Sequence, residues 1–97
     1  MIRHTVVFRL KHPAGSPEEE DFLRTAKSLA SISGVEKFEQ LRQVSAKNEY
    51  HFGFSMEFAD QVAYQHYNDH PEHVAFVRDR WVPEVTVFME IDYTPLD

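Results

Sequence analysis

The stretch AYQHYNDHPEHVAFV, residues 63–77, combines a helical hydrophobic pattern with a proline at position 71. Proline has no amide proton to donate, and its ring disfavours the helical conformation in the residue before it. A helix that begins near Asp60 is therefore predicted to end at or before His70. A second short helix can begin with Pro71, because amide protons in the first helical turn are unpaired anyway. This break frees Tyr67 and His73 from the angular spacing of one straight helix.

The N-terminal residues alternate between apolar and polar, which is typical of a β-strand. Within residues 2–11, one face carries Ile2, His4, Val6, Phe8 and Leu10. His4 is the exception on this apolar face. Its ring either packs in the core beside a hydrogen-bonding neighbour or projects into a cavity.

A helix start follows the first strand. Ser16 can cap the helix, Pro17 suits its first position, and Glu19 would complete a capping box. Gly34 is placed to end this helix in a left-handed conformation. Residues 35–45 form a weaker strand pattern whose apolar residues recur every three positions, which indicates a bulge or an exposed edge.

Two more strands complete the pattern. Residues 50–58 place five large apolar side chains on one face, and these are Tyr50, Phe52, Phe54, Met56 and Phe58. Asp60 would cap the second helical region, and residues 84–93 alternate as the last strand. The order β-α-β-β-α-β predicts an α+β fold of the ferredoxin-like type, an antiparallel four-stranded sheet with helices on one face.

The other face of this sheet has no helix to cover it. Val7, Phe88 and Leu41 are expected there, on strand faces opposite the main apolar stripes. The chain of 97 residues is one domain, residues 1–97, and a domain of this size leaves much surface exposed. Such folds often complete their burial by dimerising.

Composition excludes several classes of function. The net charge is −6, with 16 acidic and 10 basic residues and no basic run, which argues against nucleic acid as a partner. There is no cysteine, so neither a thiolate nucleophile nor a disulfide is available. No apolar run is long enough for a membrane span or a signal segment. The sequence has no glycine-rich phosphate loop, so no organic cofactor is implied. A soluble cytoplasmic protein without a cofactor is expected.

The motif Tyr67-x-x-His70-Pro71-x-His73, followed by Phe76, resembles the core motif of the stress-responsive dimeric α/β-barrel (Dabb) family. Three more segments share the likeness, namely Ile2-Arg3-His4, Phe58-Ala59-Asp60 and Ile91-Asp92-Tyr93-Thr94-Pro95. The resemblance implies a homodimer in which two sheets meet face to face and form an eight-stranded barrel.

The resemblance also implies a chemistry. The family includes a plant polyketide cyclase whose active tyrosine and histidine fall on the positions of Tyr67 and His73. A histidine can exchange a proton near neutral pH, and a tyrosine hydroxyl can stabilise an enolate, so a cyclase-like lyase or isomerase is implied. The ligand would be a small apolar molecule with a carbonyl or phenol group. The residues expected to bind it are His4, Val6, Phe8, Phe54 and Phe76.

Three other interpretations stay open at the sequence level. In the first, the protein is a non-catalytic stress-response dimer, and His70 and His73 only cap and pack. In the second, His66, His70 and His73 would bind a metal, although Pro71 disrupts their common face, so no metal is expected. The third is a monooxygenase of the same dimeric barrel fold, for which no residue pattern is found.

Overall fold

The computed structural model describes residues 1–97. Its strands are β1 (Ile2–Leu10), β2 (Glu36–Arg42), β3 (Phe52–Phe58) and β4 (Val85–Tyr93). Its helical segments are α1 (Pro17–Ala26), the 3₁₀ turn η1 (Lys27–Ser31), α2 (Gln61–Asp69), α3 (Pro71–Phe76), the π turn η2 (Val77–Trp81) and α4 (Val82–Glu84). None of the helices combines the length and the apolar character needed to cross a bilayer.

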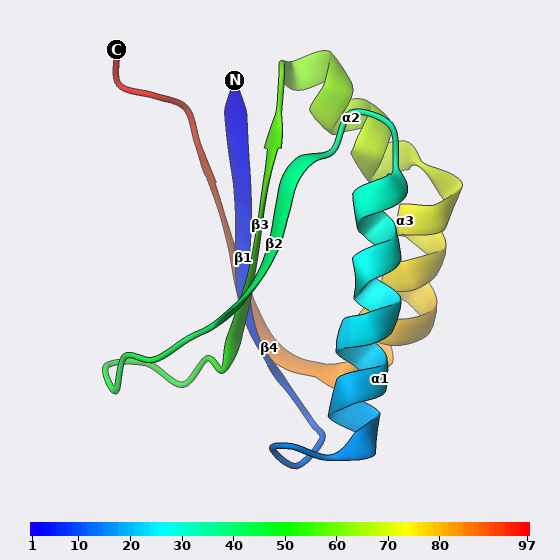
Figure 1. Cartoon of the computed structure of the whole chain (residues 1–97), viewed down its shortest axis with the longest axis vertical. Helices are drawn as coiled ribbons and strands as arrows, with labels where there is room; N and C mark the ends of the chain where they lie inside the picture. Colours follow the sequence, from blue (N-terminus) through cyan, green and yellow to red (C-terminus); the bar gives the residue numbers. More distant parts are fainter.

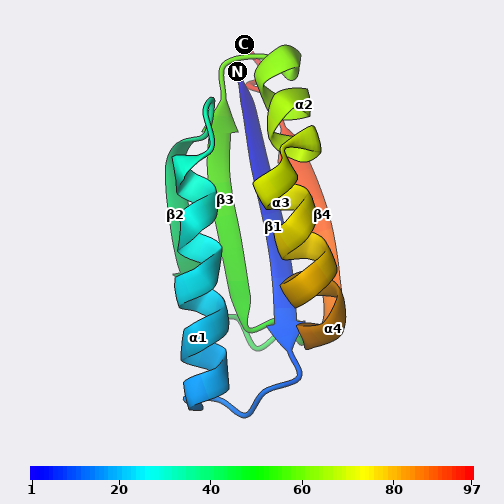
Figure 2. The same cartoon turned by 90° about the vertical axis from the view of Figure 1, so that its right-hand side faces the viewer.

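The four strands form one antiparallel sheet in the order β2-β3-β1-β4. All helices lie on one side of this sheet, and the other side is bare (Figure 1). Seen from the helix side, α1 covers the half with β2 and β3, whereas α2 to α4 cover the half with β1 and β4 (Figure 2). This arrangement confirms the predicted ferredoxin-like fold.

The first helix begins as predicted, with one difference in its cap. The Ser16 hydroxyl accepts a hydrogen bond from the Glu19 amide at 3.2 Å. The Glu19 carboxylate, however, accepts from the amide of Gly15 at 3.1 Å and not from that of Ser16. The Ser16 amide is already engaged, because it donates to the carbonyl of Pro13. The capping box is therefore displaced by one residue.

The second helical region breaks where Pro71 predicts it. Helix α2 ends at Asp69, and His70 has an extended backbone with ψ at 133°. Helix α3 then begins with Pro71, and the Nδ1 atom of His70 accepts a hydrogen bond from the Glu72 amide at 3.1 Å. One side chain thus caps the helix that proline restarts.

The core between sheet and helices is mostly aromatic. Phe8 is fully buried at its centre, with ring centroids 4.8 Å from Phe54, 4.9 Å from Trp81 and 5.9 Å from Phe22. Burial of a phenyl side chain of this kind stabilises the fold by roughly 2–3 kcal/mol. Contacts between β1, β3, α1 and η2 therefore meet at one residue.

The register of β4 corrects one prediction. His4 lies opposite Asp92, and Phe8 lies opposite Phe88. Cross-strand partners point to the same side of a sheet, so Phe88 faces the helices and the prediction that it lies on the uncovered face was wrong. The alternating pattern of an isolated strand defines two faces, but it does not say which of them is turned inward.

The uncovered face of the sheet is rich in apolar side chains. Val7 and Leu41 lie there as predicted, because both are register partners of Gly53. The outward stripe of β4 joins them, since its odd-numbered residues pair with the outward residues of β1. The apolar side chains of this face that are more than a third exposed are Leu41, Met89, Ile91 and Tyr93.

Strand β2 is an edge strand with an irregular start. Its pairing with β3 shifts in register between Glu36 and Glu39. Lys37, within this shift, has a positive φ of 50°. The prediction that a bulge or an exposed edge explains the weak pattern of residues 35–45 is confirmed, because the strand has both.

The cap of α2 gives a test of local stability. The Asp60 carboxylate accepts a hydrogen bond from the Ala63 amide at 2.8 Å. We expect Asp60→Ala to lower the free energy of unfolding by about 1 kcal/mol, because the substitution leaves that amide without its cap. Urea denaturation measures the change. Gln61→Ala, at the neighbouring exposed position, should cause almost no loss, and equal losses in the two variants would argue against the capping role.

Candidate active site between sheet and helices

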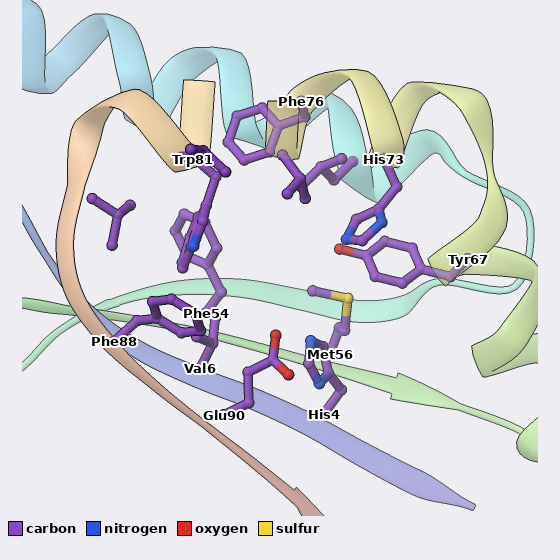
Figure 3. Close-up of a pocket in the computed structure, with 14 residues that line it drawn as sticks. His4, Val6, Phe54, Met56, Tyr67, His73, Phe76, Trp81, Phe88 and Glu90 are labelled. Atoms are coloured by element: carbon purple, nitrogen blue, oxygen red, sulfur yellow. The ribbon is translucent and has the colours of Figure 1, made fainter. Parts of the chain in front are cut away.

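A cavity of about 420 Å³ lies between the sheet and the helices. This volume is typical of sites for small organic ligands. Of its 14 lining residues, 11 are hydrophobic, namely Val6, Leu29, Phe54, Met56, Tyr67, Phe76, Val77, Trp81, Val82, Val85 and Phe88. The other three are His4, His73 and Glu90. The wall is thus apolar, with a few polar groups directed into it (Figure 3).

The helix break brings Tyr67 and His73 together. Tyr67 comes from the last turns of α2 and His73 from the first turn of α3. Their ring centroids are 4.4 Å apart, and the ring planes are tilted by 45°. Figure 3 shows the Tyr67 hydroxyl beside the imidazole, at the edge of the cavity. The conformation imposed by Pro71 is therefore what places the pair.

The Tyr67 hydroxyl remains a proton donor in this setting. The residue is only 2% exposed, and burial, followed by the charge of Glu90, raises its pKa well above the ordinary value of 10.0. The hydroxyl has no hydrogen-bond partner in the protein. Every fully buried side-chain nitrogen or oxygen atom of the structure does have a partner, so the hydroxyl oxygen cannot be fully buried. The oxygen is thus open to the cavity and not sealed in the core.

His73 is held in one orientation by the backbone. Its Nδ1 lies 3.1 Å from the carbonyl oxygen of Asn68. A carbonyl only accepts, so Nδ1 carries the proton and Nε2 is left as an acceptor. Burial lowers the pKa of His73, which favours the neutral ring. One nitrogen therefore has a structural role, while the other is free to meet a ligand.

His4 joins the site from the sheet side. It is 6% exposed, and its ring centroid is 6.3 Å from that of Tyr67. Its Nδ1 is 2.6 Å from Asp92 and 3.0 Å from the hydroxyl of Tyr64. Nε2 has no partner in the protein and, by the reasoning used for Tyr67, is open to the cavity. Both sequence interpretations of His4 thus hold, since it is bonded to neighbours and also lines a cavity.

The structure places the sequence-predicted residues as follows. Tyr67, His73 and His4 line the cavity, together with the predicted apolar residues Val6, Phe54 and Phe76. Phe8 does not line it, which corrects its expected role in ligand contact. It is fully buried behind Phe54 and Trp81, so it supports the wall and does not form its surface.

Several site residues were missed by sequence reasoning. Glu90 and Phe88 enter the cavity because β4 turns this face toward the helices. Trp81 enters from the π turn η2, a local feature that no sequence pattern indicates. Glu90 pairs with Val6 and Phe88 pairs with Phe8, so the register of β1 and β4 would have predicted that both face the helices. The sequence alone does not give this register.

Glu90 is the one acidic residue in the cavity lining, and no lysine or arginine accompanies it. Its carboxylate forms no hydrogen bond or ion pair in the structure. Its charge nevertheless acts on the site, since it contributes to raising the pKa of Tyr67 and opposes the lowering of the pKa of His73. The field inside the cavity is therefore unfavourable to anions.

The histidines of the motif do not gather around a common point. The ring centroids of His66 and His70 are 5.7 Å apart, and Nδ1 of His70 is used by the Glu72 amide. The structure has no group of three metal-binding side chains close enough to share an ion.

Nearly the whole chain aligns with one protein family. The model of the stress responsive A/B barrel domain, Dabb, matches residues 2–95. The chain belongs to the Dabb family. The resemblance carried by Tyr67, His70, Pro71 and His73 is thereby confirmed. No curated protein matches this Dabb chain by sequence.

Solved structures share the fold of this Dabb domain over almost its full length. A Dabb family protein with a ferredoxin-like fold from Mesorhizobium loti is 70% identical, with a TM-score of 0.98, and the match covers 99% of this chain and 97% of that one. A dimeric protein of unknown function from Bacteroides fragilis is 23% identical, with a TM-score of 0.72 and coverage of 95% and 93%. A hydroxynitrile lyase from Passiflora edulis is 12% identical, with a TM-score of 0.82 and coverage of 95% and 90%. The last two likenesses concern the fold alone.

The environment of His73 predicts a specific pH dependence. We expect its ring to titrate below the ordinary pKa of 6.5, because burial disfavours the imidazolium. The unfolded chain then binds this proton more readily. The contribution of His73 to stability is therefore complete above pH 6.5 and is lost as the pH falls toward the folded-state pKa. NMR titration of the imidazole protons measures the midpoint, and a value above the ordinary pKa would contradict this account. His73→Asn should remove this part of the pH dependence.

Proposed function

We propose that this Dabb protein binds a small, neutral, mostly apolar molecule with a carbonyl or phenol group in the cavity. One observation carries the proposal. Three polar atoms without partners in the protein, the Tyr67 hydroxyl and the Nε2 atoms of His73 and His4, adjoin a cavity whose lining is apolar apart from them and the Glu90 carboxylate. A ligand oxygen or hydroxyl group could take the place of water on these atoms, and an apolar cavity with a few convergent polar atoms is typical of a ligand site.

The same groups suit acid–base chemistry next to a carbonyl. A histidine takes a proton from the ligand, and His73 is the one that the motif places beside Tyr67. The Tyr67 hydroxyl then donates a hydrogen bond to the oxygen on which negative charge develops. His4 provides a polar contact from the sheet side, and its free Nε2 makes it the second imidazole available in the cavity. The reaction class that fits is ring closure or isomerisation through an enolate, as in a cyclase-like lyase or isomerase.

Glu90 narrows the class of ligand. An anionic ligand in the cavity would meet this carboxylate without a lysine or arginine to compensate its charge. Glu90 is exposed to solvent, which screens part of this repulsion, but no cation in the lining offsets it. The ligand is therefore neutral as it enters, and carboxylates and phosphates are disfavoured. The enolate differs from these anions, because an imidazolium forms together with it and the cavity gains no net charge.

A non-catalytic function is the second candidate, and the backbone contacts of the motif favour it. His70 caps α3 through Nδ1, and His73 donates to the Asn68 carbonyl. These contacts would keep the motif useful to the fold even without a reaction. Under this alternative the protein is a stable stress-response dimer.

We also infer that two copies of the chain pair through their uncovered sheet faces. Each face exposes Leu41, Met89, Ile91 and Tyr93, and an apolar sheet face of this kind is stabilised when a second sheet packs on it. The protein of the same fold from Bacteroides fragilis is described as dimeric. Pairing of this kind would produce the eight-stranded barrel implied by the family.

Ligand binding tests the first proposal. We expect the protein to bind para-cresol about tenfold more tightly than para-toluate, in titration calorimetry, because only the second is an anion. Glu90→Gln should reduce this preference. Tyr67→Phe should weaken para-cresol binding by about 1 kcal/mol through loss of one hydrogen bond. Tyr50→Phe, which removes a hydroxyl outside the cavity, is the matched control. Unchanged affinity in both Tyr67→Phe and His73→Ala would favour the non-catalytic alternative.

The mass in solution tests the dimer. We expect the parent to sediment at twice the chain mass of 11.4 kDa. Ile91→Glu should shift it to the monomer, because two charges would then be buried in the sheet-to-sheet contact. Val62→Lys, at an exposed valine on α2, should leave the mass unchanged. A monomeric parent at micromolar concentration would exclude the dimer.

A further inference from the structure

His4 lies between two polar neighbours on one side and the cavity on the other. Its Nδ1 is 2.6 Å from Oδ1 of Asp92 and 3.0 Å from the hydroxyl oxygen of Tyr64. The Tyr64 hydroxyl also lies 2.7 Å from Oδ2 of Asp92. The three side chains therefore form a closed triangle behind the cavity wall, with one residue each from β1, α2 and β4.

These contacts determine which nitrogen of His4 carries a proton. Burial and the adjacent Asp92 raise the pKa of Tyr64, so its hydroxyl keeps its one proton and donates it to Asp92. The Tyr64 oxygen and the other carboxylate oxygen can then only accept. The proton they share must come from Nδ1 of His4. In the neutral ring Nε2 is consequently the bare nitrogen, and it is the atom open to the cavity.

The second imidazole of the cavity lacks this support. Nδ1 of His73 donates to a neutral backbone carbonyl, that of Asn68, and burial lowers the pKa of the ring. A carboxylate beside an imidazole stabilises the protonated ring far more than a neutral carbonyl does. The two imidazoles therefore differ in what Nδ1 faces, which is a carboxylate and a tyrosine hydroxyl for His4 but a backbone carbonyl for His73.

We propose that His4 is the group that holds the transferred proton in this cavity, and that Asp92 and Tyr64 are its positioning residues. The proposal rests on the function proposed above and specifies which imidazole acts. The carbon next to the ligand carbonyl gives its proton to Nε2 of His4. The C–H electron pair forms the carbon–carbon double bond of the enolate, and the carbonyl pair moves to oxygen, which accepts a hydrogen bond from Tyr67. The imidazolium lies against Asp92 until the proton returns to carbon.

The tautomer of His4 is the first measurement, because it needs no ligand and starts from the parent protein. Two-bond nitrogen–proton NMR correlations distinguish the two nitrogens of each ring. We expect a protonated Nδ1 and a bare Nε2 for neutral His4 in the parent. Asp92→Asn should give a mixture that includes the Nε2–H form, since a carboxamide can also donate to Nδ1. Asp79→Asn, which removes the same charge from an exposed site on η2, should leave the tautomer unchanged.

Proton transfer is measured with propiophenone in heavy water, as exchange of the hydrogens next to its carbonyl. We expect Asp92→Asn to lower kcat by at least tenfold while KM changes by less than about twofold, because the carboxylate acts on the base and not on the ligand. Tyr64→Phe should lower kcat in the same direction by a smaller factor. Asp79→Asn should catalyse hydrogen exchange on propiophenone at the same rate as the parent.

The outcomes separate the two proposals. A parent that does not accelerate exchange overturns the proposed catalysis. A parent that does so, but whose kcat is unchanged in Asp92→Asn and abolished in His73→Ala, leaves the proposed function standing and overturns the role of His4. An Nε2–H tautomer in the parent also overturns it. If Asp92→Asn does not fold, as judged by circular dichroism, Tyr64→Phe and the parent tautomer still decide the question.

Discussion

Pro71, which has no amide proton and whose ring disfavours a helical conformation in the residue before it, is the constraint on which the site depends. It ends α2 at Asp69, leaves His70 extended, and allows α3 to restart in a new direction. A continuous helix would hold Tyr67 and His73 in fixed angular positions along one axis. The break instead brings their rings to a centroid distance of 4.4 Å at the edge of a cavity. The backbone conformation that Pro71 imposes thus determines where the side chains of Tyr67 and His73 lie.

Much of the fold follows from local signals. Alternation identified three of the strands, Ser16 and Asp60 marked two helix starts, and Pro71 marked the break, because these signals depend on neighbours in the sequence. Which face of β4 is turned inward depends instead on its pairing with β1. The partners His4 and Asp92, for example, are 88 residues apart in the sequence. No local rule contains that register, so Phe88 was assigned to the wrong side.

The candidate site divides in the same way. Tyr67, His73 and His4 were recognised from a motif, and the structure brings all three to one cavity. Asp92 and Tyr64 were not assigned to the site, because their contacts with His4 join three elements. The cavity itself depends on the distance between helices and sheet and on side-chain rotamers, which sequence periodicity does not define. Phe8 illustrates this, since the same alternating pattern places Val6 at the cavity and Phe8 behind it.

The Glu90 carboxylate has a consequence for the release of molecules from the cavity. A neutral molecule would occupy the cavity without electrostatic cost, but an anion there would face a negative charge that no lysine or arginine offsets. The anion would bind to the cavity more weakly than a neutral molecule of the same shape, and it would dissociate faster. If the proposed reaction ended in an acidic product, the cavity would therefore release that product faster than its neutral precursor.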